Sequence, residues 1–102
     1  MSSDWYILNH NKVPVRASAE AWRKWLAVKG EDSRQVAYTK INGAKVSTVF
    51  LGLDHRWGEG PPLLFETLVF EGKHDGYCDR CCTWTEAEAQ HAAVVAMIES
   101  TE

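Results

Sequence analysis

The sequence has no long hydrophobic run. Its longest apolar run covers residues 92–98, whereas a helix that spans a bilayer needs about 20 apolar residues. The start of the chain also lacks the basic region and apolar stretch that are typical of a secretory signal. We therefore expect a cytoplasmic protein with no membrane partner.

Charge of one sign is not concentrated anywhere. The 11 lysines and arginines and the 14 acidic residues are scattered along the chain, and the formal net charge is −3. Where basic residues come closest together, around residues 16–34, Glu20, Glu31 and Asp32 interrupt them. Nucleic-acid-binding proteins usually gather Lys and Arg on one face, so we expect no nucleic-acid partner.

Cysteine is scarce, and its placement argues against a disulfide framework. The three cysteines, Cys78, Cys81 and Cys82, are odd in number and share one short segment, which fits a reducing compartment. Cys78 and Cys81 have the spacing of a zinc half-site, but alternation along a strand would place them on opposite faces. We therefore predict no metal and no cofactor, and interpret the thiols as small apolar side chains.

The length and composition fit one domain. The chain has 102 residues, of which 45% are apolar, enough to close a core without disulfides or metal. We expect a single α+β domain over residues 1–102, with a mainly antiparallel sheet of four to five strands and two amphipathic helices on one face. The predicted order is strand, helix, four strands and helix.

The first third of the chain contains signals for a strand and a helix. Residues 5–15 predict a strand region, interrupted by a turn-prone segment, and Pro14 places it at a sheet edge. Ser18 can cap a helix that begins at Ala19. Gly30 can end that helix in the left-handed conformation.

The pair Asn42-Gly43 lies between two strand-like runs. Both central residues of a type I′ turn need positive φ, which Asn and Gly tolerate, so the pair predicts a β-hairpin. A two-residue loop would pair Ile41 with Ala44 and Tyr38 with Ser47.

The second half predicts two further strands and a helix. Residues 63–70 are apolar on both faces except at Glu66 and Thr67, which is typical of a central strand. The last strand is expected within residues 77–83, and the segment 83–86 has the form of a capping box. The following helix should pack on the sheet through Trp84, Ala87, His91, Val94 or Val95, and Ile98.

Two polar residues fall where apolar ones are expected. His91 lies on the apolar face of the last helix, and we interpret it as a core residue with hydrogen-bonded ring nitrogens rather than as a ligand or a base. Glu66 would need a partner or a raised pKa if it were buried. We expect it to face outward beside Leu64 and Leu68; a buried ion pair and a catalytic role are the alternatives.

The strongest functional candidate is the loop of residues 54–62. It is longer than a hairpin needs and is stiffened by Pro61-Pro62. The side chains that we predict to bind a protein are His55, Arg56, Trp57 and Glu59. Trp and Arg are enriched in interface hot spots, and loops on a rigid sheet often carry binding groups. The alternative is that Trp57 folds back over the core.

Three stretches carry a resemblance to known sequences. They read VSTVFLGLDH (residues 46–55), GPPLLFETLVF (residues 60–70) and TWTEAEAQH (residues 83–91). Together they resemble a group of short, uncharacterised proteins encoded by bacteriophages and prophages, over about the C-terminal half of the chain. Typical members lack the cysteine cluster of this chain, which further disfavours a metal site.

The resemblance implies a setting rather than a mechanism. Small, acidic, cofactor-free phage proteins commonly bind and block a host protein, including antiviral-defence components such as CRISPR complexes. The leading hypothesis is therefore a protein-binding module that inhibits or modulates a host protein in the host-cell cytoplasm.

One alternative is a structural or accessory phage protein that self-associates, for example as a homodimer. The other is a small hydrolase or metal-dependent enzyme using Asp54, His55 and Glu66, although we expect no enzyme.

Overall fold

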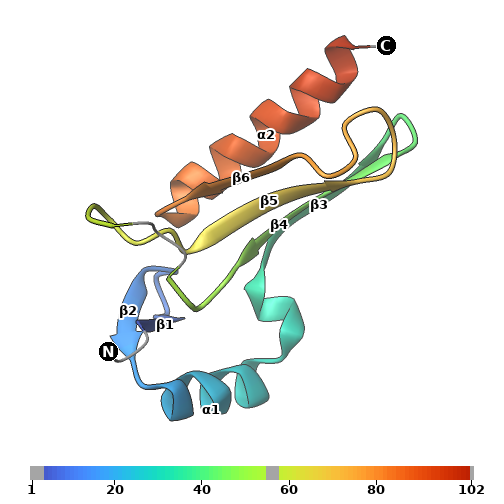
Figure 1. Ribbon diagram of the computed structural model, residues 1–102. Helices are drawn as coiled ribbons and strands as arrows, with labels where there is room; N and C mark the ends of the chain where they lie inside the picture. The colour runs from blue at the N-terminus through green and yellow to red at the C-terminus, as the bar shows by residue number, and fades with distance from the viewer. Residues whose placement is uncertain (1–3, 55–57, 102) are drawn as a thin grey trace.

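The computed structural model describes residues 4–54 and 58–101 (Figure 1). Its elements in chain order are β1 (Trp5–Leu8), β2 (Pro14–Ala17), α1 (Ala19–Lys29), the 3-10 helix η1 (Glu31–Arg34), β3 (Gln35–Ile41), β4 (Ala44–Phe50), β5 (Phe65–Phe70), β6 (Cys78–Cys81) and α2 (Trp84–Ser100). Neither α-helix in these residues is long and apolar enough to cross a membrane.

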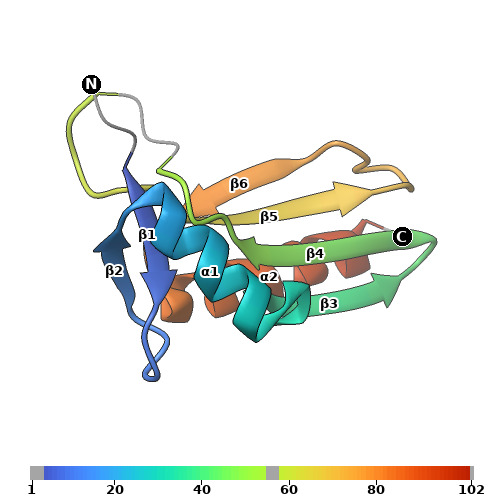
Figure 2. The same cartoon turned by 90° about the horizontal axis from the view of Figure 1, so that it is seen from below.

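The strands form two antiparallel sheets. β1 and β2 make a separate hairpin, and β3, β4, β5 and β6 follow one another in a four-stranded sheet. α2 runs along one face of this sheet, whereas α1 packs on the hairpin at the end of the sheet, on the side opposite α2 (Figures 1 and 2). The predicted α+β class, with its antiparallel sheet and two helices, is confirmed.

Two details differ from the expected arrangement. The first strand region is a hairpin, because the side-chain oxygen of Asn9 accepts bonds from the N–H groups of Asn11 and Val13 and closes a turn. Only α2 covers the four-stranded sheet. The indoles of α1 pack elsewhere, since Trp22 contacts Trp5 of the hairpin in a tilted arrangement and Trp25 contacts the sheet at Phe50, the last residue of β4.

The local signals in the sequence are confirmed. Asn42 and Gly43 have φ of 50° and 78°, and the β3–β4 register pairs Ile41 with Ala44 and Tyr38 with Ser47. β5 lies between β4 and β6, as a central strand should. The hydroxyl of Ser18 caps α1, and the capping box at Thr83 and Glu86 is complete. Gly30 ends α1 as expected and with a positive φ of 85°, but its ψ of 165° lies outside the expected left-handed helical conformation.

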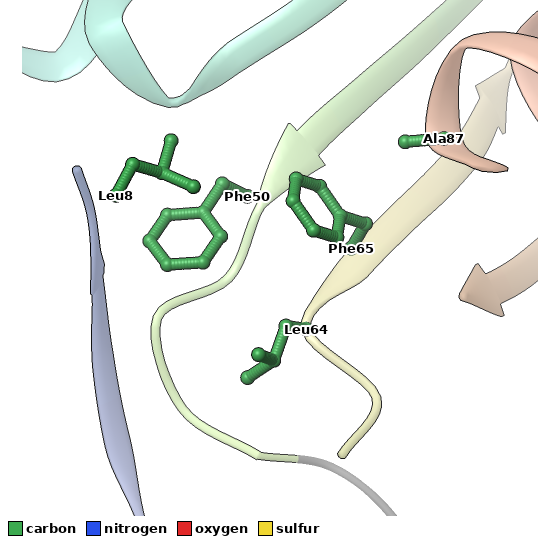
Figure 3. Packing of buried hydrophobic residues seen from close by; sticks show 5 residues of the cluster. All are labelled: Leu8, Phe50, Leu64, Phe65 and Ala87. Atoms are coloured by element: carbon green, nitrogen blue, oxygen red, sulfur yellow. The ribbon is translucent and has the colours of Figure 1, made fainter. Parts of the chain in front are cut away.

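The core between α2 and the sheet consists of two apolar clusters. The first contains Leu8, Phe50, Leu64, Phe65 and Ala87, and the rings of Phe50 and Phe65 lie 5.4 Å apart (Figure 3). The second contains Ala44, Val46, Val69, Val94 and Ile98. Along β4 the buried side chains alternate strictly with partly exposed ones, so the second face of this strand points away from α2.

Gly52 lies where the end of the four-stranded sheet packs against α1. It follows β4, has φ of 83°, and lies directly against the indole of Trp22. A Cβ at this position would overlap the indole ring, so only glycine allows this close approach.

The substitution Gly52→Ala should therefore be strongly destabilising. We expect it to lower the free energy of unfolding by about 2 kcal/mol or more, because overpacking adds to the cost of a positive φ. Gly76→Ala is the matched control, since Gly76 has φ of 88° but nothing within 4 Å of the added carbon. Chemical denaturation measures both, and equal losses would contradict the packing role of Gly52.

Candidate functional site

The predicted binding loop is only partly described. His55, Arg56 and Trp57 lie outside the described residues, so their role in binding stays a prediction. Glu59, the fourth predicted contact residue, is exposed. Asp54, at the start of the loop, accepts a hydrogen bond from the N–H of Leu63 at 3.0 Å.

A layer of buried polar side chains separates the two apolar clusters. His91 of α2 contacts the hydroxyls of Thr39 at 2.9 Å through Nε2 and of Thr48 at 2.8 Å through Nδ1. Thr48 contacts Thr67 at 2.7 Å, and Thr67 donates to Oε1 of Gln90 at 2.9 Å. Thr48 and Thr67 are completely buried and His91 is 6% exposed, so these groups satisfy one another in place of water.

The number of hydroxyl protons determines which group donates in each hydrogen bond of this network. Because the only hydroxyl proton of Thr67 goes to Gln90, the hydroxyl of Thr48 must donate to Thr67. Thr48 then has no proton left for His91, so Nδ1–H of His91 donates to Thr48. Burial favours the neutral ring, in which Nε2 accepts from the hydroxyl of Thr39. With Gln90 in this orientation, His91 is the neutral Nδ1–H tautomer.

The His91 ring is buried and hydrogen-bonded within this network. Burial lowers the pKa of His91, because the charged imidazolium would lose its hydration. Both ring nitrogens of His91 are already hydrogen-bonded, to the hydroxyls of Thr39 and Thr48. The interpretation of His91 as a hydrogen-bonded core residue agrees with this geometry.

The three thiols differ in burial: Cys78 is exposed and Cys81 and Cys82 are partly buried, so the interpretation as apolar packing does not fit Cys78. Burial raises the pKa of Cys81 to about 11 and also raises the pKa values of Cys78 and Cys82, so little thiolate forms near neutral pH. In residues 4–54 and 58–101, no group of three or more His, Cys, Asp or Glu side chains is placed to hold a metal ion.

Glu66 points away from α2, as expected, and has a partner. Its Oε2 accepts bonds from Arg80 at 2.9 and 3.0 Å and from the thiol of Cys78 at 3.4 Å, and its side chain is 18% exposed. Leu64, expected beside it, is instead buried in the first apolar cluster. Glu66 is thus paired with Arg80, whereas Asp54 bonds to the backbone of its own loop at Leu63.

The face of the four-stranded sheet opposite α2 forms a continuous surface, which we call the open face. Strand alternation and register place on it Gln35, Tyr38, Lys40, Lys45, Ser47, Val49, Glu66, Leu68, Phe70, Cys78 and Arg80. Seen from this side, the sheet is crossed by neither helix except near the end where α1 lies (Figure 2). Beyond its α1 end, the open face is thus a side of the sheet that neither helix covers.

Apolar side chains lie in adjoining rows of the open face. Ser47 pairs with Tyr38 on one side and with Leu68 on the other, while Phe70 is two residues beyond Leu68. Tyr38 is 48% exposed and Phe70 is 45% exposed. The open face therefore presents two half-exposed aromatic side chains to solvent.

The two edges of the sheet are poorly suited to pairing. β3 carries a register shift between Gln35 and Ala37, and the exposed Lys40 lies on the same strand. β6 is only four residues long and exposes Asp79 and Arg80. Bulges, short strands and charges are the devices that keep edges from pairing, so the face is the better candidate than the edges for contact.

Comparisons of the chain with protein families, with curated proteins and with solved structures found no match.

The open face was not predicted from the sequence, although one pair of its residues could have been. The Asn-Gly turn fixes Tyr38 opposite Ser47, but the register of β4 against β5, which adds Leu68 and Phe70, depends on a long connection.

The lowered pKa of His91 predicts how stability depends on pH. As pH falls, the unfolded chain takes up the proton near the ordinary value of 6.5, before the folded chain does. The contribution to stability is therefore complete above about pH 6.5, decreases below it, and levels off once folded His91 is itself protonated.

Denaturation at a series of pH values measures this effect. We expect His91→Gln to flatten the decrease below pH 6.5, whereas His10→Gln, at an exposed position, should preserve it. Nitrogen chemical shifts of the His91 ring should also show the Nδ1–H tautomer. An unchanged pH profile in His91→Gln would show that the pKa of this residue is not lowered.

Proposed function

We propose that this chain is a protein-binding module that acts by contact through its open face rather than by catalysis. The observation that carries the proposal is the exposure of Tyr38 and Phe70 on a sheet face that neither helix covers beyond its α1 end. Aromatic residues are enriched at the centres of protein interfaces, where they contribute much of the binding energy.

The sheet is a suitable platform because its other face packs against α2. α2 and the buried polar layer support it from behind, and both aromatic side chains belong to strands rather than loops. A pre-organised surface loses little conformational entropy on binding, so a small contact can be specific.

The partner that we propose is a host protein, inhibited or modulated in the host-cell cytoplasm, in keeping with the resemblance to phage-encoded proteins. The loop residues predicted from the sequence, His55, Arg56, Trp57 and Glu59, are proposed as a second contact region. Self-association is the weaker alternative, because both sheet edges carry features that oppose pairing.

Substitution of the exposed aromatic residues tests the proposal. Tyr38→Ser and Phe70→Ser should each weaken partner binding by about tenfold, since each removes a large apolar contact of more than about 1 kcal/mol. Val28→Ser is the matched control, because Val28 is 82% exposed but lies on α1. Tagged proteins would be used as bait in lysate of the bacterial host, with quantitative mass spectrometry of retained proteins.

The expected result is a protein retained by the native chain and by Val28→Ser but lost with Tyr38→Ser and Phe70→Ser, while all variants unfold cooperatively. Equal retention by all four chains would contradict binding through the open face. A native chain that sediments as a dimer, and as a monomer after Tyr38→Ser, would instead establish self-association.

A further inference from the structure

One end of the open face carries two lysines side by side. Lys40 of β3 lies directly opposite Lys45 of β4. The two side chains line a hollow of about 300 Å³ beside the hairpin turn, together with Asn42 and Glu71.

The positive charge of this end is only partly compensated. Nζ of Lys45 bonds to Glu71 at 3.2 Å, whereas Lys40 has no carboxylate partner in the described part of the chain. Like charges directly opposite each other on paired strands disfavour folding. Both positions lie on the face away from the core, so packing does not require lysine at either of them.

The lysines adjoin the aromatic side chains. Phe70 pairs with Lys45 across β4 and β5, and Tyr38 precedes Lys40 by two residues on β3. A separation of two residues along a strand is about 7 Å. A short extended segment can therefore reach the lysines with one side chain and an aromatic ring with another.

We propose that the partner presents an acidic segment to this end of the open face, with a carboxylate between Lys40 and Lys45 and apolar side chains against Tyr38 and Phe70. This inference rests on the proposed function and names the chemistry of its partner. A single-stranded nucleic acid fits less well, because its phosphates need a groove of cations that follows the strand, whereas this end of the face offers the one cross-strand pair Lys40 and Lys45.

A random twelve-residue peptide library, displayed and selected on the native protein, tests the chemistry without a known partner. Peptides that also bind Tyr38→Ser are removed by counter-selection. We expect the remaining peptides to contain an excess of Asp and Glu beside an apolar residue.

The affinity of the best peptide should fall about fivefold for Lys40→Gln and for Lys45→Gln, and should weaken at high salt. Lys24→Gln, on the exposed side of α1, is the control and should change nothing.

The outcomes separate the two proposals. Selected peptides that are neutral or basic, yet depend on Tyr38, would overturn the acidic segment while leaving binding through the open face intact. A selection that yields only peptides independent of Tyr38, or none, would count against both. Binding of a fluorescent oligo-dT strand more tightly than of the best acidic peptide would also overturn the inference.

Discussion

The hydrogen bonds of His91 hold the fold in its register. His91 reaches Thr39 and Thr48 on two neighbouring strands, and Thr48 continues the network to Thr67 on a third. Apolar contacts alone would allow α2 to slide along the sheet, because hydrophobic attraction has little directionality. A buried hydroxyl left without a partner costs free energy, so the polar layer fixes one position of the helix.

The fixed helix determines which surface remains for binding. Because α2 occupies one face of β3 to β6, and the indoles of α1 pack on the hairpin and the sheet end, the opposite face is left largely uncovered. That face combines exposed aromatic rings at Tyr38 and Phe70 with the adjoining lysines Lys40 and Lys45. The core and the proposed binding surface are thus two sides of the same strands.

Local features of this fold could be predicted from the sequence, and long-range ones could not. The turn at Asn42-Gly43 and the caps at Ser18 and Thr83 depend on a few neighbouring residues, and all were correct. The separate hairpin, the placement of α1 and the open face depend on contacts between distant segments. His91 combines a local and a long-range feature. Its place on the helix indicated a buried ring, but its two partners, Thr39 and Thr48, lie on strands far from it in the sequence.

The most direct test of this account is the stability of Thr48→Val, which keeps the shape of the side chain but removes the central hydroxyl. We expect it to lower the free energy of unfolding by about 1–3 kcal/mol, because Nδ1–H of His91 loses its acceptor and Thr67 loses its donor. Thr85→Val, the same change at an exposed position of α2, should be nearly neutral. A Thr48→Val protein as stable as the native chain would contradict the claim that the polar layer holds α2 on the sheet.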